Sequence, residues 1–451
     1  MYFKGLQQKP YVIVFDKTII QIMQPIANIP QTTFPRVVIV GGGFAGMKLA
    51  RNLSKKEFQV ILIDKNNFHQ FQPLYYQVAT AGLEPSSIAF PMRKAFQNFE
   101  HTHFRMAELQ TIKAENNSIE TSLGSLSYDY LVLAIGADTN FYGKPDVERA
   151  ALPMKSVGEA LRIRNTILEN YEKALNSTDP LEQQELMNIV IVGGGATGVE
   201  LAGALAEMKK YVFPKDYPEM DFDKMGIYLI EASQRVLAAM SEDSSRKGEK
   251  YLRDMGVQVF TKTKVISCDS KRVRTDKDQE IPVEMVLWTA GIAVPEIEGL
   301  EKAQKMRGGR VKVNRFNQIE EYGNIFAIGD MAFMTEPKYP NAHPQVAPPA
   351  IQQGTLLAEN LGRLVSGKAM KEFKYSHQGS MATVGRNRAV VELGKFHFGG
   401  FVAWAFWLFV HLMSIVGSKN RIFIFMNWMV NYLSYDQSLR LIMKPSRRKG
   451  I

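Results

Sequence analysis

Two glycine-rich motifs, each directly after an apolar run rich in β-branched residues, constrain the fold of this chain more than any other feature. The sequence GGGFAG at 41–46 follows the run Arg36–Val40, and GGGATG at 193–198 follows NIVIV at 188–192. A buried strand that ends in glycines and leads into a helix is the turn of a dinucleotide-binding βαβ unit. The sequence therefore predicts an α/β protein with two Rossmann-like domains.

The glycines of the first motif have separate expected roles. Gly41 permits the tight turn, Gly43 lets the backbone approach a pyrophosphate at the helix N-terminus, and Gly46 allows close packing of helix on strand. Asp64 ends the next strand, 18 residues after Gly46, where a carboxylate can accept from a ribose hydroxyl. A tight turn without a ligand is the alternative, and the combination of strand, helix and acid disfavours it.

The second motif repeats this construction, with Glu231 at the end of its second strand. A carboxylate at that place binds the ribose diol of NADH and repels the 2′-phosphate of NADPH. An irregular insert at 209–224 lengthens the spacing from Gly198 to 33 residues, so a merely solvated Glu231 remains the alternative. Two such units in one chain bring a flavin and a nicotinamide together for hydride transfer.

The order of the strands predicts that the second domain is inserted into the first. A buried strand at 127–137 is typical of the inner parallel sheet of the first domain. The apolar strands at 286–291 and 324–330, which follow both motifs in the chain, are unlikely to complete either unit alone. The expected division is an N-terminal extension at 1–34, a first domain at 35–150 and 286–375, a second domain at 151–285, and a C-terminal region at 376–451.

Cysteine usage and charge exclude several classes of protein. Cys268 is the only cysteine, so the chain forms no intramolecular disulfide and lacks a redox-active pair; a buried position is expected for it. The segment from residue 376 onward contains ten basic and two acidic residues, so the first 375 residues are nearly neutral. This distribution favours an anionic membrane surface over nucleic acid. The seven histidines form no metal pattern, and His101 and His103 are expected to be a surface pair on a strand.

The C-terminal region is apolar and aromatic. Residues 401–417 predict a helix of about 26 Å, at the lower limit for crossing a bilayer. We therefore expect helices that lie in one leaflet, with a buried core or dimer helix as the alternative. The aromatic residues expected in the headgroup zone are Trp404, Trp407, Trp428, Tyr432 and Tyr435.

Several segments resemble the two-dinucleotide-binding-domain flavoproteins. Asp330 in IFAIGD matches the residue that binds the ribityl chain of FAD in that superfamily, and GAD at 136–138 and TAG at 289–291 resemble its connecting strands. Within it, the chain from Pro35 onward is most similar to the type II, non-proton-pumping NADH:quinone oxidoreductases. FQPLYYQVA at 71–79 resembles the segment beside the isoalloxazine, GVELAG at 198–203 resembles the segment whose Glu200 lies near nicotinamide and flavin, and APPAIQQ at 347–353 resembles the quinone-site motif.

This resemblance implies the site residues. For FAD they are Gly41, Gly43, Phe44, Ala45, Gly46, Asp64, Lys65, Gln72, Pro73, Leu74, Gly136, Asp330 and Ala350. For NADH they are Gly193, Gly195, Ala196, Thr197, Gly198, Glu231 and Gly291. The catalytic residues are Glu200, Gln352 and Gln353, although an ordinary first-turn helix residue is an equal interpretation of Glu200. Two positions depart from the family: Pro348 stands where many members have Gln, and Gln378 where relatives often have Lys.

The predicted function is NADH:quinone oxidoreduction without proton pumping, in a respiratory chain. Hydride passes from NADH to a non-covalent flavin, and two electrons pass to a membrane quinone. The protein is expected on the cytoplasmic face of the inner membrane, without nucleic acid or metal, and a homodimer follows from the resemblance alone. Sulfide:quinone and dithiol reductases share this architecture but require paired cysteines, so the single cysteine excludes both. A soluble NADH oxidase or ferredoxin reductase remains an alternative that leaves the basic, aromatic C-terminus unexplained.

Overall fold

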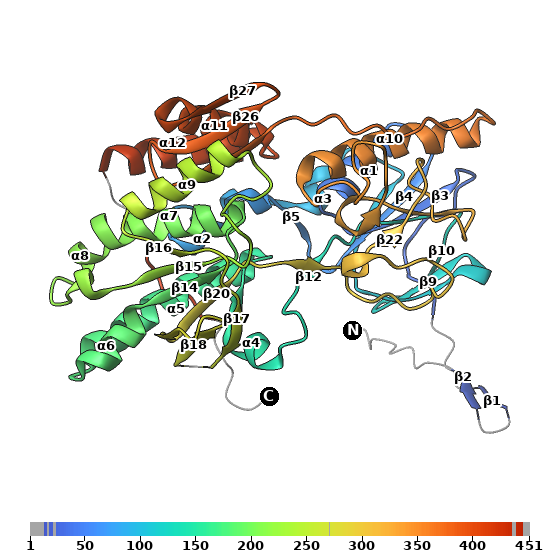
Figure 1. Ribbon diagram of the computed structural model, residues 1–451. Helices are drawn as coiled ribbons and strands as arrows, with labels where there is room; N and C mark the ends of the chain where they lie inside the picture. The colour runs from blue at the N-terminus through green and yellow to red at the C-terminus, as the bar shows by residue number, and fades with distance from the viewer. Residues whose placement is uncertain (1–12, 16–17, 21–23, 270, 435–438, 445–451) are drawn as a thin grey trace, which may run out of the picture. The chain divides into compact units, whose positions relative to one another are not determined.

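A computed structural model describes residues 13–15, 18–20, 24–269, 271–434 and 439–444 (Figure 1). The chain divides into two units, each made of three segments. Unit 1 contains residues 1–69, 91–137 and 294–376, and unit 2 contains residues 70–90, 138–293 and 377–451. Of the expected extension at 1–34, residues 1–12, 16–17 and 21–23 lie outside the described residues, as do Tyr435 and the basic residues Arg447, Arg448 and Lys449.

Unit 1 is built on a five-stranded parallel sheet in the order β23-β11-β3-β4-β7. The strands are β3 (Arg36–Val40), β4 (Gln59–Asp64), β7 (Thr102–Met106), β11 (Tyr130–Leu133) and β23 (Ile325–Ala327). The helices α1 (Phe44–Leu53) and α10 (Ala347–Val365) pack against each other on one face. An antiparallel sheet of β8 (Leu109–Lys113), β9 (Ser118–Thr121) and β10 (Gly124–Ser127) contributes Ile112, Ile119 and Leu126 to the core of this unit.

The remaining elements of unit 1 are short. They are β1 (Ile13–Phe15), β2 (Thr18–Ile20), α3 (Met92–Phe96), η3 (Ala114–Asn116), η5 (Arg307–Gly309), β22 (Val311–Lys312), η6 (Gly329–Met331) and β24 (Ala332–Phe333), while β5 (Phe68–Gln70) and β6 (Ala89–Pro91) lie where the chain passes between the units.

Unit 2 contains a second five-stranded parallel sheet, in the order β13-β20-β14-β15-β16. Its strands are β13 (Leu152–Pro153), β14 (Ile189–Val192), β15 (Ile227–Ile230), β16 (Gln258–Phe260) and β20 (Met285–Trp288). Figure 1 shows α7 (Ala196–Tyr211) and α9 (Glu242–Asp254) on one side of this sheet, and α5 (Val157–Asn176) and α6 (Pro180–Met187) on the other. Ser156 caps α5 by accepting from the backbone N–H of Glu159.

The remaining elements of this part of unit 2 are short. They are η1 (Gln72–Leu74), α2 (Tyr75–Ala79), η2 (Pro85–Ser87), β12 (Asp138–Thr139), α4 (Pro145–Ala150), α8 (Phe213–Asp216), η4 (Phe222–Lys224), β17 (Val265–Cys268), β18 (Arg272–Thr275), β19 (Glu280–Pro282) and β21 (Ile292–Ala293). Cys268 is buried as predicted.

The predicted fold class is confirmed. Strand β23 follows the whole second sheet in the chain, yet it pairs with β11 of the first sheet, so the second domain is an insertion in the first. The prediction that residues 209–224 are irregular is wrong in part, because α7 continues to Tyr211 and the insert contains α8 and η4. Phe213 and Phe222 stack there at 5.6 Å between ring centroids, which gives the insert a small core of its own. The predicted domain bounds stay a prediction.

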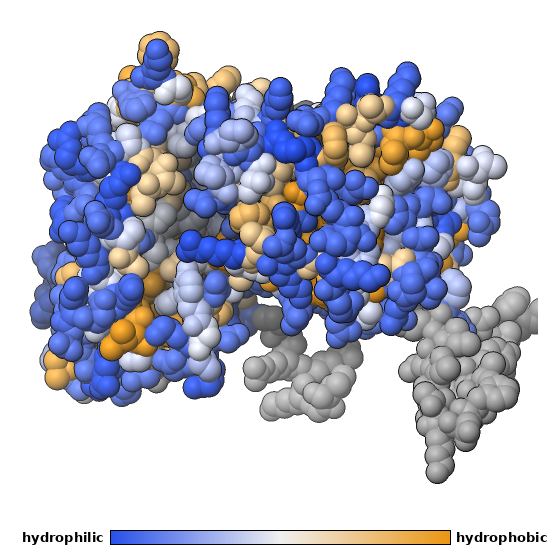
Figure 2. Space-filling model, turned by 45° about the vertical axis from the view of Figure 1, so that its right-hand side comes forward, coloured by the Kyte–Doolittle hydropathy of each residue, from blue (hydrophilic) through white to orange (hydrophobic). Residues whose placement is uncertain are grey.

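The described part of the C-terminal region contains a three-stranded antiparallel sheet followed by two helices. The strands are β25 (Ser380–Thr383), β26 (Ala389–Leu393) and β27 (Phe396–Gly399), and the helices are α11 (Gly400–Ser414) and α12 (Ser418–Ser434). Among the described residues, no helix has both the length and the apolar character needed to cross a bilayer. Figure 2 shows one face of the molecule, which is largely hydrophilic but carries separate hydrophobic patches.

One aromatic prediction for this region is wrong. Trp407 is only 1% exposed, because its indole stacks on His411 at 3.8 Å between ring centroids and packs at the edge of Tyr76. Tertiary contacts thus place this tryptophan in the interior, although its amphipathic character favours a headgroup zone.

Candidate active site

The first glycine loop leaves space where a phosphate is expected. Gly41 has φ +105°, and a Cβ there would lie 2.3 Å from the carbonyl oxygen of Ala134. A Cβ on Gly46 would lie 1.9 Å from the oxygen of Gly41, so both positions require glycine. In contrast, a Cβ on Gly43, the N-cap of α1, would meet no atom within 4 Å. The open side of the loop therefore faces the N-terminal end of the helix, where the helix dipole favours an anion.

The second glycine loop has the same geometry. Gly193 has φ +111°, and a Cβ on Gly198 would lie 1.9 Å from the oxygen of Gly193. A Cβ on Gly195 would meet nothing within 4 Å, and Gly195, Ala196 and Thr197 are exposed. The two motifs thus share one pattern, in which two glycines are needed for packing and one leaves open space.

The acids at the ends of the second strands also match. Asp64 Oδ2 accepts from the backbone N–H of Gly42 at 2.6 Å, and Glu231 Oε2 accepts from that of Gly194 at 2.5 Å. Strand β15 lies directly beside β14, so the insert changes the sequence spacing but not the place of Glu231. Glu231 thus binds the backbone of its own loop, and its ribose-binding role stays a prediction.

A buried histidine that the sequence did not single out holds the first loop. Nδ1 of His69 lies 2.9 Å from the carbonyl oxygen of Gly42, and its ring packs edge-on against Phe44. Because a carbonyl oxygen only accepts, Nδ1 is the donor. Burial lowers the pKa of His69, so the ring stays neutral and serves to position the loop.

Residues distant in sequence meet around Asp330. Gly329 has φ +74°, and a Cβ on it would lie 3.3 Å from that of Ala45 and 3.6 Å from that of Ala350. Gln353 is 2% exposed, and its Oε1 accepts from the backbone N–H of Gly329 at 2.7 Å. Unit 1 therefore brings three of the predicted FAD residues, Ala45, Asp330 and Ala350, together at the start of α1.

Both predicted catalytic glutamines are bonded to backbone groups. Gln353 supports the turn at Gly329, while Gln352 donates from Nε2 to the oxygen of Ser376 at 2.8 Å and accepts from its N–H at 3.0 Å. These contacts fix the first turns of α10 and the chain that leaves it. A direct contact of either amide with quinone stays a prediction.

The other predicted residues lie in turns of the two units. Lys65 is exposed, Gln72 and Pro73 begin η1, and Leu74 is fully buried at its end. Gly136 and Gly291 both have φ +76°, and the phenol of Tyr142 occupies the space beside Gly291.

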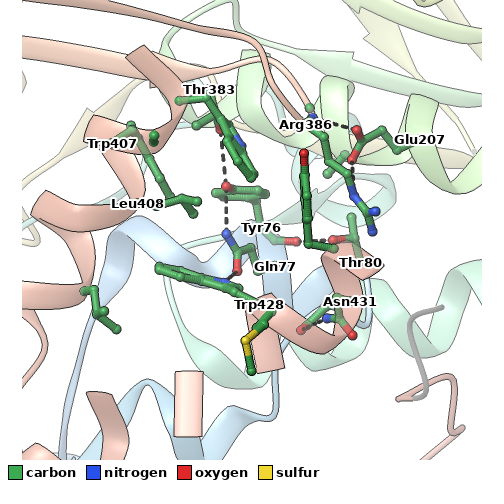
Figure 3. Close-up of a pocket in the computed structure, with 18 of the residues that line it drawn as sticks. Tyr76, Gln77, Thr80, Glu207, Thr383, Arg386, Trp407, Leu408, Trp428 and Asn431 are labelled. Atoms are coloured by element: carbon green, nitrogen blue, oxygen red, sulfur yellow. Dashed lines mark hydrogen bonds and ion pairs between the residues drawn. The ribbon is translucent and has the colours of Figure 1, made fainter. Parts of the chain in front are cut away.

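Unit 2 contains a cavity of about 450 Å³. Its lining is mainly apolar and aromatic, with Leu408, Phe409, Leu412 and Trp428 from the C-terminal helices facing Tyr76 and Gln77 of α2. Thr383, Glu207 and Arg386 are among its few polar lining groups (Figure 3). A cavity of this size and composition fits a flat, largely apolar molecule that carries a few polar atoms.

Glu200 lies behind one wall of this cavity. Its side chain is 7% exposed, and its only described hydrogen bond comes from the backbone N–H of Thr383 to Oε1 at 3.4 Å. Burial raises the pKa of Glu200 to about 8, while the N–H of Thr383 and the indole of Trp407 act to lower it. Because the indole nitrogen of Trp407 makes no hydrogen bond of good geometry, we regard its contribution as small. Glu200 is therefore a carboxyl that keeps its proton at neutral pH.

A chain of hydrogen bonds leads from the cavity wall toward Glu200. The indole N–H of Trp428 donates to Gln77 Oε1 at 2.7 Å, and Gln77 Nε2 donates to the hydroxyl of Tyr76 at 2.9 Å. The Tyr76 hydroxyl lies 3.3 Å from Thr383 Oγ1 (Figure 3). Since an indole only donates, the orientation of the Gln77 amide is fixed, and the Tyr76 proton points toward Thr383 or the cavity.

Sequence reasoning did not select most residues of this arrangement. Tyr76 and Gln77 fell within the segment at 71–79 but not among the predicted site residues, and Thr383, Glu207, Arg386 and Trp428 were not assigned a chemical role. Only Glu200 was found, through its motif. The sequence signal for this site was an acidic residue, Glu200, within a largely apolar helix. It indicates a chemical role only when the neighbouring side chains are known.

Comparison with known proteins agrees with this geometry. Residues 35–354 match the family model described as pyridine nucleotide-disulphide oxidoreductase, and residues 377–434 match that of the NDH2 C-terminal domain. The type II NADH:quinone oxidoreductase Ndh of Mycobacterium tuberculosis is 32% identical over 91% of this chain and 90% of its own length. The chain belongs to the type II NADH:quinone oxidoreductase family.

Relatives of this NADH:quinone oxidoreductase extend to other organisms. The external alternative NADH-ubiquinone oxidoreductase of Yarrowia lipolytica mitochondria is 26% identical over 87% of this chain and 78% of its own length. The structure of NDH2 from Plasmodium falciparum in complex with NADH superposes with a TM-score of 0.84 at 19% identity, and covers 91% of this chain and all of the other. The latter likeness supports the fold.

These comparisons confirm the predicted family, fold and enzyme class. The chain is an oxidoreductase of the NADH dehydrogenase type, with the fold of flavin- and nicotinamide-dependent enzymes. Sulfide:quinone oxidoreductase from Aquifex aeolicus has the same fold, at a TM-score of 0.70 and 18% identity over 89% of this chain and 95% of the other. The single cysteine of the present sequence separates it from disulfide chemistry.

Proposed function

We propose that this enzyme oxidises NADH at the second glycine loop, uses FAD at the first, and reduces a membrane quinone in the cavity of unit 2. The observation that carries the proposal is the pair of open glycine loops, each with a strand-end acid bound to its second glycine. The proposal includes no proton pumping. When bound, FAD accepts hydride from NADH and supplies two electrons to the quinone.

The residues of both loops fit the groups assigned to them. A dinucleotide pyrophosphate needs backbone that it can approach closely, and the spaces beside Gly43 and Gly195 provide it. Asp330, Ala45 and Ala350 lie together in unit 1 and are the proposed neighbours of FAD there. Glu231 is the proposed acceptor for the ribose of NADH.

The cavity offers the quinone what a ring with two carbonyl oxygens and an apolar tail requires. The aromatic and aliphatic side chains of α11 and α12 exclude water from the tail, and the hydroxyls of Tyr76 and Thr383 can donate to a carbonyl oxygen. Glu200 holds the proton that such an oxygen needs when it is reduced. Quinone reduction thus takes place beside a carboxyl that is protonated at neutral pH.

The direct test is anaerobic. NADH should bleach the bound flavin of the purified enzyme rapidly, NADPH should do so much more slowly, and a soluble quinone should restore the oxidised spectrum. If NADH leaves the flavin oxidised, or quinone does not reoxidise it, the proposal is wrong.

Glu231→Gln should weaken NADH binding by about tenfold or more. The substitution removes the negative charge that binds the ribose diol, and a hydrogen bond to a charged group contributes about 1.5–3 kcal/mol. Steady-state kinetics should show a raised KM for NADH and a smaller preference over NADPH. Asp64→Asn is the matched control, since it changes the equivalent acid of the first loop and should alter flavin retention instead. An unchanged KM for NADH in Glu231→Gln would remove this residue from the site.

We further propose that α11 and α12 place the enzyme on the cytoplasmic face of an anionic membrane. Large apolar side chains on these helices are exposed, among them Phe401, Phe409, Ile422, Phe423 and Leu433. Lys395, Lys419, Arg421, Arg440 and Lys444 lie in the same C-terminal region. An exposed apolar face with neighbouring basic residues suits a helix that lies within the interface of a bilayer.

The double variant Phe423→Glu/Leu433→Glu should lose most binding to anionic vesicles. These side chains are 56% and 76% exposed, and burying each in lipid contributes about 1.5–3 kcal/mol, so roughly 100-fold or more weaker binding is expected. Flotation with phosphatidylserine-containing liposomes measures it, with Leu181→Glu on α6 as the control because Leu181 is 70% exposed on another helix. Should the double variant float as the wild type does but lose a dimer in sedimentation, a second copy covers this face instead.

A further inference from the structure

A second acid of α7 faces the cavity. Glu207 follows Glu200 by seven residues, or two helical turns, so both side chains lie on one side of the helix, about 10 Å apart along its axis. Glu200 does not line the cavity, whereas Glu207 does and its side chain remains 17% exposed. Glu207 therefore has access to water through the cavity, whereas Glu200 lacks that access.

The surroundings of Glu207 fix its side chain in place, and their net effect raises its pKa. Its Oε1 accepts from the backbone N–H of Arg386 at 2.6 Å, and its Oε2 lies 3.9 Å from Arg386 Nε. Arg388 also acts on it, and both arginines lower its pKa, but burial is the larger effect and raises the pKa above the usual value for glutamate. Gly385 has φ +69° and no side chain, which allows this backbone to approach the carboxylate.

Tyr76 lies within the electrostatic influence of both acids. Burial raises the pKa of its hydroxyl, and Glu200 and Glu207 each raise it further. Its oxygen already accepts from Gln77, so its own proton is directed toward Thr383 Oγ1 or into the cavity. Tyr76 and Thr383 thus form a pair of hydroxyls between the cavity and the buried Glu200.

We propose that Glu207 is a second proton-carrying carboxyl of this enzyme, which takes protons from solvent and passes them across the cavity to the Tyr76 and Thr383 hydroxyls beside Glu200. The inference rests on the proposed quinone reduction. NADH, one proton and quinone give NAD⁺ and hydroquinone, so each turnover takes one proton from solvent. The O–H bond of Glu207 breaks as an O–H bond forms at the next oxygen, and each oxygen releases its own proton in turn until one forms an O–H bond at the quinone oxygen. A proton taken from solvent then restores the O–H bond of Glu207. No electrons move in this relay.

Glu207→Gln tests the relay in the full-length, FAD-loaded enzyme. The amide keeps an acceptor for the N–H of Arg386 but carries no transferable proton. We expect reoxidation of the reduced flavin by a soluble quinone to slow by about tenfold or more, with a larger solvent deuterium isotope effect and partial rescue by formate or by Glu207→Asp. Ferricyanide accepts electrons without protons, so its reduction should fall far less. Glu219→Gln, at an exposed acid of the same unit, is the control.

A readout independent of turnover is the carboxyl infrared band that disappears in Glu207→Gln. Its titration should lie above that of an exposed glutamate. The inference is overturned if this band titrates in the ordinary range, if Glu207→Gln reoxidises with quinone at the wild-type rate, or if ferricyanide and quinone rates fall equally, which indicates a structural role. A wild-type enzyme that does not reduce quinone at all would instead contradict the proposed function.

Discussion

Gly195→Val is expected to leave the chain folded while lowering the affinity for NADH by at least 100-fold. The backbone at Gly195 is extended, with φ −70° and ψ −178°, so valine fits it without strain. The new side chain enters space in which no protein atom lies within 4 Å of the Cβ, and that space is the proposed seat of the pyrophosphate. Thermal unfolding and anaerobic NADH titration of the flavin spectrum measure the two effects.

Gly198→Ala, three residues further on, should have the opposite effect. Its Cβ would lie 1.9 Å from the oxygen of Gly193 and 2.9 Å from Thr289 Oγ1, so the backbone must move and the second domain should lose several kcal/mol of stability. The two variants thus distinguish the glycine that leaves room for the ligand from the glycine that the packing of the motif requires. Wild-type NADH affinity in Gly195→Val would show that the open side of the loop does not hold the cofactor.

The nucleotide-binding parts of this enzyme could be predicted from sequence because their signals are local. A β-branched run, three glycines at fixed spacing and an acid at the next strand end are read within a few dozen residues, and the structure has β3, α1, β14 and α7 where the patterns placed them. The insert before Glu231 lengthens the sequence spacing, but β15 still pairs in parallel with β14, so Glu231 lies at the end of the neighbouring strand as predicted.

The cavity could not be predicted in this way. Tyr76 and Thr383 are 307 residues apart in sequence, and Gln77 and Trp428 are 351 apart, so no local pattern pairs them. Each has an ordinary interpretation alone, as part of an apolar loop, a strand or an interfacial helix. Trp407 shows the same limit, since composition favours the membrane interface and packing against His411 and Tyr76 buries it.

Glu200→Gln is expected to change both the stability and the pH dependence of the enzyme. Burial raises the folded-state pKa of this carboxyl from 4.5 to about 8. Below pH 4.5 the group is protonated in both states and has no effect. Between pH 4.5 and about 8 the unfolded chain loses the proton that the folded chain keeps, so wild-type stability falls as pH rises. Above pH 8 the loss amounts to roughly 5 kcal/mol, and the glutamine variant does not suffer it.

The measurement is denaturant unfolding of both proteins from pH 4 to pH 9. The free energy of unfolding of the variant should increase steadily relative to that of the wild type as the pH rises across this range. Glu219→Gln, at an exposed position, should not gain. A constant difference between wild type and Glu200→Gln would mean that the pKa of Glu200 is the same in the folded and the unfolded chain.

We expect the same proton to be used in the proposed reduction of quinone. Since only the protonated carboxyl can donate, the wild-type quinone step should decline as pH rises through about 8, and Glu200→Gln should be slower by roughly 100-fold and lack that decline. Stopped-flow reoxidation of the reduced enzyme by quinone, followed over the same pH range, provides the test. A variant that is slow but retains the wild-type pH dependence would place the titrating group elsewhere, with Glu207 as the next carboxyl to examine. Agreement between the unfolding and kinetic pKa values would tie the buried proton of the folded state to the one delivered to quinone.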